Sequence, residues 1–266
     1  MKQLIINSDD YGRTPDISRG IREAHLLGVV TSTTCMMNIP TTAADIAVAR
    51  KETPALGLGV HLVLTMGRPI LPRHSVASLT DDNGNFFKYS ALIEHLPGIR
   101  IDEVKAEWHA QVEAFVNAAG RNPTHLDSHH HSSYFSPELF RAMLELAREY
   151  DCAIRFPFTN EIWDELQETN KHVPDLIKVF NPRRPDYFIA GWYDEGATHE
   201  NLLNILSILE DGASELMCHP GHVDGTFASE SVYNYQRERE LKILTDPAIK
   251  EVIQANGIEL ITFAEL

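Results

Sequence analysis

The sequence predicts a single α/β domain over residues 1–266, in which about seven parallel strands alternate with helices and favour a barrel. Its 266 residues suffice for one large domain, and no shift in composition divides them. Short apolar runs alternate with segments of helical periodicity, a pattern typical of a parallel sheet covered by helices. Polar side chains follow several of these runs, as they do at the carboxyl ends of barrel strands.

The first third of the chain has a β-α-β-α-β pattern. Thr14 followed by Pro15 predicts a helix N-cap with proline at the first helical position, and Gly28 predicts its end. A long stretch containing Pro, Gly and Asp then continues to about residue 97. Strands are expected at residues 3–7, 31–38 and 56–64, and helices at residues 14–28 and 42–51.

The rest of the chain continues the alternation. Apolar residues recur at helical spacing from Val104 to Ala119 and again from Leu139 to Tyr150, which predicts two amphipathic helices. Strands are expected at residues 124–127, 153–156, 186–190, 215–218 and 258–262, and helices at residues 102–120, 136–150, 199–209 and 235–253.

The composition argues against nucleic-acid and membrane partners. The formal charge of −15 repels nucleic-acid phosphate and anionic lipid, and no Lys/Arg run offsets it. The first strand reaches Asp9 and Asp10 at once, which leaves no apolar stretch of signal-peptide length, and the three cysteines form no Cys-x-x-Cys pair. We therefore expect a cytoplasmic protein with reduced thiols that acts on a small substrate.

Two adjacent carboxylates, Asp9 and Asp10, follow the first predicted strand. Neighbouring carboxylates at the end of a buried strand repel each other unless a cation or a proton compensates, and a bound metal would do so. Because successive strand residues point to opposite sides, one carboxylate could ligate the metal while the other faces the water to be activated. The alternative is that the pair only caps the following helix.

Histidines supply a second set of candidate ligands. His61 follows a strand whose glycines let a ligand approach, although a lone histidine there could be structural. Residues 125–131 contain four histidines and an aspartate. Such a group rarely serves packing alone, because each imidazole needs partners for both nitrogens. The alternative is a solvated tract that binds metal adventitiously.

Geometry limits how this histidine segment could bind one ion. In an extended strand, His125 and His129 would lie about 13 Å apart, too far to share an ion with bonds of about 2 Å. Either the chain turns after Asp127 or one of the two is not a ligand. The favoured metal ligands are Asp10, His61 and His125, and the residues expected to contact substrate or add a metal contact are His129, Asp127 and His131. Two imidazoles, a carboxylate and an open position are typical of a catalytic site.

Two later residues complete the predicted site. Arg155 ends a strand, where its charge could hold Asp9 ionised, or it is a surface arginine beside a turn proline. His219 follows a buried strand and precedes a turn, which suits a general acid or, alternatively, a capped turn. Trp192 and Tyr193 could stack on a sugar ring or pack in the core.

These motifs resemble the YdjC-type carbohydrate deacetylases, the group that contains chitooligosaccharide deacetylase. The matching segments occur in order over nearly the whole chain, and the histidine-rich one is the most specific. They are Asn7-Ser8-Asp9-Asp10-Tyr11-Gly12, Val30-Thr31-Ser32-Thr33-Thr34, Gly59-Val60-His61-Leu62-Val63-Leu64-Thr65, Pro123-Thr124-His125-Leu126-Asp127-Ser128-His129-His130-His131 and Met217-Cys218-His219-Pro220.

The resemblance implies a distorted (β/α) barrel, a homodimer and a divalent cation such as Mg²⁺, with Zn²⁺ or another transition metal as alternatives. It also implies removal of acetyl groups from N-acetylglucosamine units during chitin breakdown. More distantly, the chain is similar to the NodB-type polysaccharide deacetylases, whose first aspartate is the base and whose second binds metal. Those enzymes take both imidazoles from one His-x-x-x-His motif, whereas the ligands of the YdjC-type family include the separate His61.

The mechanism expected from this reading is metal-assisted hydrolysis of an acetamide. Asp9 takes the water proton, and His219 or His129 protonates the departing amine. One alternative is hydrolysis of a phosphorylated disaccharide of the cellobiose-phosphate type, although glycoside hydrolysis normally needs two opposed carboxylates. The other is a sugar-binding protein without catalytic activity.

Overall fold

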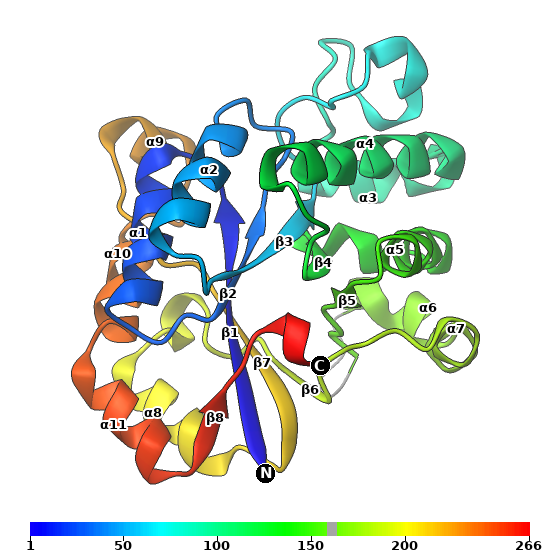
Figure 1. Ribbon diagram of the computed structural model, residues 1–266. Coiled ribbons are helices and arrows are strands. Elements are labelled where there is room, and N and C mark those ends of the chain that lie inside the picture. The colour runs from blue at the N-terminus through cyan, green and yellow to red at the C-terminus, as the bar shows by residue number, and fades with distance from the viewer. Residues whose placement is uncertain (159–163) are drawn as a thin grey trace.

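The computed structural model describes residues 1–158 and 164–266, and it confirms an α/β fold built on one parallel sheet (Figure 1). Seven strands follow one another in the order β5-β4-β3-β2-β1-β7-β6, and β8 pairs with the start of β1. Their bounds are β1 (Lys2–Tyr11), β2 (Ser32–Cys35), β3 (Gly57–Leu62), β4 (His125–Ser128), β5 (Ala153–Ile154), β6 (Tyr187–Ile189), β7 (Gly212–Cys218) and β8 (Ile258–Leu260).

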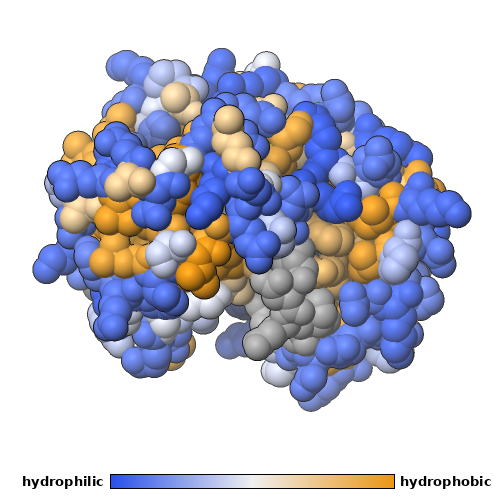
Figure 2. Space-filling model, turned by 90° about the horizontal axis from the view of Figure 1, so that it is seen from below, coloured by the Kyte–Doolittle hydropathy of each residue, from blue (hydrophilic) through white to orange (hydrophobic). Residues whose placement is uncertain are grey.

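The sheet curls into a barrel that stays open between its two end strands. Among the described residues, β5 and β6 form no ladder, and a backbone hydrogen bond from Ile154 N to Arg183 O (2.9 Å) spans them just before β6. The face in Figure 2 has a notch in its outline, with apolar residues gathered on one side. The predicted distorted barrel is therefore confirmed.

Helices surround the outside of the curled sheet (Figure 1). Around one side they contact one another in the series α10-α1-α2-α4-α5-α7. Thr14 and Ser136 cap α1 and α5 as the sequence predicted, by accepting from the backbone N–H groups of Ile17 and Leu139. The bounds are α1 (Pro15–Leu26), α2 (Thr42–Glu52), α3 (Tyr89–His95), α4 (Ile101–Ala119), α5 (Pro137–Glu149), α6 (Gln167–Asn170), α7 (Val173–Phe180), α8 (His199–Ile208), α9 (Gly225–Glu230), α10 (Tyr235–Leu244) and α11 (Pro247–Ala255).

The long segment between β3 and α4 is held by buried polar residues of α4. Gln111 pairs with both backbone groups of Val63, at 2.9 and 3.0 Å. One turn earlier, the Glu107 carboxylate accepts from two further backbone N–H groups of the segment. Side chains of α4 thus bind backbone groups of this segment that would otherwise need another partner.

Inside the barrel, an apolar cluster lies beneath a polar layer. The cluster consists of Ile5, Ala153, Ala213, Ile261 and Phe263. Because strand side chains repeat every two residues, the next inward positions along these strands belong to the same interior, one layer higher. That layer includes buried Asn7, Arg155 and Glu215. The interior of the barrel is therefore apolar at one end and polar and charged at the other.

The structure differs from the predicted elements in several places, and α3, α6 and α9 are helices that were not expected. The expected helix over residues 235–253 is two helices, because Asp246 and Pro247 start α11 as N-cap and first residue. β1 continues through both aspartates to Tyr11, and α7 lies where no helix was expected. No helix in the described part of the chain has the length and apolar character needed to cross a membrane.

Candidate active site

Asp9 and Asp10 lie in an irregular part of β1. Its register with β2 shifts between Ser8 and Tyr11, and Asp10 has a φ of 71°, in the left-handed region. A bulge of this kind re-aims side chains at the end of a strand. Both carboxylates consequently line the same cavity. The expectation that they point to opposite sides was therefore wrong, since it assumed regular strand alternation.

Asp10, His61 and His129 form a buried cluster suited to a metal ion. Asp10 Oδ1 lies 3.2 Å from His129 Nδ1 and 3.5 Å from His61 Nε2, and these two nitrogens are 3.3 Å apart. Among the described residues, Asp10 Oδ1 is a buried oxygen that makes no hydrogen bond. An oxygen and two nitrogens converging on one point fit a divalent cation with open coordination positions.

Asp127 supports the His61 imidazole from behind. Its Oδ1 lies 2.7 Å from His61 Nδ1, and its Oδ2 accepts from the Thr34 hydroxyl at 3.0 Å. β3 and β4 produce this contact, because His61 and Asp127 are register partners. A proton on Nδ1 leaves Nε2 free to face the cluster, and a carboxylate behind a ligating imidazole is a common arrangement in metal sites.

His125 lies away from this cluster. Its Nε2 contacts Asn7 Oδ1 at 3.0 Å, its Nδ1 contacts the Thr124 hydroxyl at 2.9 Å, and its ring stacks on Phe263. Asn7 in turn donates to Asp9 Oδ1 at 3.1 Å. The structure therefore brings His129, rather than His125, to Asp10 and His61. β4 stays extended through Ser128, and the chain turns only at residues 130 and 131, so the structure agrees with the alternative in which one of the two histidines is not a ligand.

Arg155 holds Asp9 as the sequence suggested, and it is fully buried. Its two terminal nitrogens donate to the two carboxylate oxygens at 2.8 and 2.7 Å, and its Nε donates to Glu215 at 2.7 Å. Burial alone would raise the pKa of Asp9, but the Arg155 guanidinium outweighs it and holds that pKa below its usual range. Asp9 is therefore an ionised, oriented carboxylate.

Arg237 of α10 pairs with the second aspartate, and our sequence reasoning missed it. Its Nη2 donates to Asp10 Oδ2 in a short contact. Burial alone would raise the pKa of Asp10, but Arg237 and His129 keep it well below the usual value. Each aspartate thus has its own arginine, so repulsion between them does not by itself require a metal. The better argument for a metal is Asp10 Oδ1, a buried oxygen that makes no hydrogen bond and faces two imidazole nitrogens.

His219 lies on the other side of Asp9. Its Nε2 is 3.8 Å from Asp9 Oδ2, and its ring meets those of Tyr193 and Tyr233 edge-on. Burial lowers the pKa of His219 to about 4, so the imidazole is neutral at pH 7. A neutral imidazole at this position must first accept a proton before it can act as an acid.

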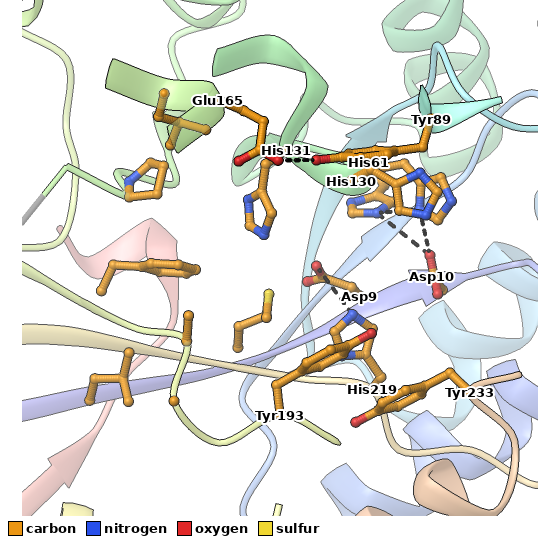
Figure 3. Close-up of a pocket in the computed structure, with 18 of the residues that line it drawn as sticks. Asp9, Asp10, His61, Tyr89, His130, His131, Glu165, Tyr193, His219 and Tyr233 are labelled. Atoms are coloured by element: carbon orange, nitrogen blue, oxygen red, sulfur yellow. Dashed lines mark hydrogen bonds and ion pairs between the residues drawn. The ribbon is translucent and has the colours of Figure 1, made fainter. Parts of the chain in front are cut away.

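These groups line a cavity of about 1360 Å³. In Figure 3, the two aspartates lie between histidines on one side and the tyrosines Tyr193 and Tyr233 on the other. His131 also lines the cavity, whereas Trp192 is buried and donates to Thr198 O at 2.9 Å. Of the two aromatic residues proposed for sugar stacking, Tyr193 is therefore the one in position, and Trp192 packs in the core.

Solved structures of two proteins share this fold. A protein from Enterococcus faecalis, provisionally assigned to cellobiose-phosphate cleavage, is 36% identical with a TM-score of 0.89, covering 99% of this chain and 98% of that one. A family 4 acetyl xylan esterase from Clostridium thermocellum, in complex with cobalt, is 12% identical with a TM-score of 0.51, covering 99% and 89%. The second likeness shows that the chain shares the open barrel fold of that esterase.

The chain belongs to the YdjC-like protein family, whose model matches residues 3–255. A relative from Enterococcus faecalis named carbohydrate deacetylase is 37% identical, covering 100% of this chain and 98% of its own. A relative from Yersinia pestis named chitooligosaccharide deacetylase is 35% identical, covering 99% of both. The predicted family and enzyme class are therefore confirmed.

Proposed function

We propose that the protein is a metal-dependent deacetylase of small chitooligosaccharides. Its substrates would be N-acetylglucosamine units in sugars such as diacetylchitobiose or its 6-phosphate. The observation that carries the proposal is the convergence of Asp10 Oδ1, a buried oxygen without a hydrogen bond, and two imidazole nitrogens beside the arginine-bound Asp9. The name of the Yersinia relative supports the choice of sugar.

The ligand set that we propose is Asp10, His61 and His129, in place of the set containing His125. Both ring nitrogens of His125 already have partners, whereas His129 Nδ1 lies 3.2 Å from Asp10 Oδ1. The resemblance suggests Mg²⁺, but imidazole ligands suit zinc and neighbouring transition metals better than magnesium, which prefers oxygen. We therefore expect Zn²⁺ to bind more tightly than Mg²⁺.

The side chains around the cluster would move protons. A bound ion would polarise the acetamide carbonyl and lower the pKa of the attacking water. Asp9, held ionised by Arg155, accepts the water proton. His219, neutral and 3.8 Å from Asp9, is placed to receive that proton and deliver it to the departing amine. Acetate and a free amino sugar result.

Acetate release tests this proposal directly. Metal-depleted protein would be incubated with diacetylchitobiose, with and without a 6-phosphate, and with added Zn²⁺ or Mg²⁺. We expect acetate only when metal is present, and loss of release on chelation. Sugar binding without acetate under every metal condition would contradict the proposal and favour a non-catalytic sugar-binding protein.

Cleavage of a phosphorylated disaccharide is the second candidate, favoured by the provisional assignment of the Enterococcus structure. A glycosidase needs one carboxylic acid that keeps its proton near neutral pH. In this site, Asp9 and Asp10 each pair with an arginine, and the pKa of both is lowered. Release of a monosaccharide without acetate in the same assay would nevertheless show that the protein cleaves the disaccharide.

A homodimer and a cytoplasmic location complete the proposal. The homodimer rests on the resemblance, and the location rests on the composition and cysteine pattern. Light scattering coupled to size-exclusion chromatography tests the first, because a mass near 29.9 kDa would show a monomer. Cell fractionation tests the second.

A further inference from the structure

Helix α10 places two buried charged side chains behind the candidate active site. Arg237 is 3% exposed and Glu240 is fully buried. They are three residues apart and therefore lie on the same face of the helix. Our metal and proton-transfer steps use neither of them. Their contacts nevertheless connect the metal cluster with His219.

Arg237 fixes the orientation of the Asp10 carboxylate. Its Nη2 binds Oδ2, which leaves Oδ1 facing His61 and His129. The guanidinium is itself held by rings, since its central carbon lies 5.3 Å from the Phe227 centroid and 5.8 Å from that of Tyr233. Arginine stacks on aromatic faces in a way that lysine does not.

The same helix also holds the backbone of His219. Arg237 Nη1 donates to the His219 carbonyl at 3.3 Å, and Glu240 Oε2 accepts from the His219 N–H at 2.5 Å. Glu240 Oε1 accepts from the Tyr233 hydroxyl as well. Both backbone polar groups of His219 are thus bound by side chains one helical turn apart.

We propose that Arg237 is a positioning residue for the metal ligand Asp10, and that α10 thereby couples the metal cluster to His219. The proposal rests on the metal site proposed above. A counter-charge alone could be supplied by lysine, but only a planar guanidinium binds Asp10 and the His219 carbonyl together while stacked on two rings. Residues that hold a metal ligand commonly set affinity as well as rate.

The test compares three variants by calorimetric titration of metal-depleted protein with Zn²⁺ alone. We expect Arg237→Met to weaken zinc binding about 10- to 100-fold, the usual effect of losing a group that orients a metal ligand. Arg237→Lys should fall between Met and wild type, because it keeps the charge without the second contact. Lys242→Met, which removes an exposed cation from the same helix, should bind zinc normally.

Each outcome separates this inference from the proposed function. Unchanged or tighter zinc binding in a folded Arg237→Met protein would show that Arg237 is only a competing counter-charge, and would overturn the positioning role. If that variant does not fold, Arg237→Lys serves as the test. A zinc affinity equal to that of wild type would then also show that Arg237 acts only as a counter-charge. Absence of zinc binding in wild type would remove the metal site itself, and with it this inference. Zinc binding without acetate release would remove only the deacetylase reaction.

Discussion

The two ends of the cavity are built differently. At the catalytic end, three buried groups have fixed partners: Asp9 with Arg155, Asp10 with Arg237, and His61 with Asp127. At the other end, the lining is largely apolar and partly solvent-exposed, with Ile208 66% exposed. The chemistry is thus set by a network that is complete before substrate arrives. Selection of the substrate falls to a surface with few polar constraints.

This contrast predicts two kinds of mutational effect. Removal of one partner from a buried charged network leaves the other unpaired. Substitutions there should therefore cause large losses of zinc binding or of kcat. At the open end, water can take the place of a shortened side chain. Substitutions there should therefore cause smaller losses of substrate affinity. The following predictions begin with the largest effect.

The largest effect should separate His129 from His125. His129→Ala should abolish measurable zinc binding and lower kcat by more than about 100-fold, beyond the usual cost of losing an outer partner, because it removes a ligand. His125→Ala should retain zinc, since His125 contacts Asn7 and Thr124 instead. Calorimetry and acetate release measure both. The reverse pattern would restore the ligand set with His125.

Asp9→Asn should separate proton transfer from metal binding. The amide cannot accept the water proton, so kcat should fall about 10²- to 10⁴-fold, the usual contribution of a general base. Zinc affinity should stay near that of wild type, because both Asp9 oxygens are bound by Arg155 and Asp9 is outside the proposed ligand set, although it lies close to His61. Loss of zinc binding in a folded variant would instead make Asp9 a ligand.

Local sequence was sufficient for most strands of the sheet and for polar residues near their carboxyl ends, but not for α7 or for the break before α11. Asp9, Asp10, His61 and Arg155 each follow an apolar run, and parallel strands bring such positions to one edge. The register partner of His61 could not be predicted, because it depends on how β3 aligns with β4. Arg237 also gave no local signal: it lies 227 residues from Asp10, in a helix rich in charge.

The sequence also could not show which of His125 and His129 joins the proposed metal ligands. Both lie in one short histidine-rich segment, and the choice depends on where the chain turns. The turn follows Ser128 and places His130 and His131 in the left-handed region, where non-glycine residues are uncommon. Such a conformation persists only when the surrounding structure supports it. Spacing therefore indicated that the two histidines do not share one ion in an extended strand, but it could not tell which of them meets Asp10 and His61.

Where the open end meets His219, Tyr193→Ala should change substrate binding more than chemistry. The Tyr193 ring stacks on Tyr233 with centroids 4.6 Å apart and lines the cavity beside His219. Loss of one aromatic contact should raise KM about 3- to 10-fold and leave kcat nearly unchanged. Tyr193→Phe, which keeps the ring, is the matched control. A fall in kcat with constant KM would place Tyr193 at the catalytic end.

The smallest effect concerns the charge on Glu215, which Arg155 binds at the base of the catalytic end. Burial raises the pKa of Glu215 to about 8, although Arg155 acts in the opposite direction. In the unfolded chain a glutamate has a pKa of about 4.3. Between that pH and the folded pKa, only the folded protein keeps the proton on Glu215. The stability due to Glu215 is then complete at low pH and is lost as the pH rises toward about 8.

Glu215→Gln cannot titrate and keeps an oxygen that accepts from Arg155 Nε. Its unfolding temperature, relative to wild type, should therefore rise by a few degrees between about pH 5 and about pH 8. Glu251→Gln, at an exposed position of α11, should show no such trend in thermal unfolding. A constant difference for Glu215→Gln would mean that Glu215 is ionised in the folded protein. Arg155 would then balance the buried carboxylates of Asp9, Asp127 and Glu215, and the catalytic end would gain stability from a bound cation.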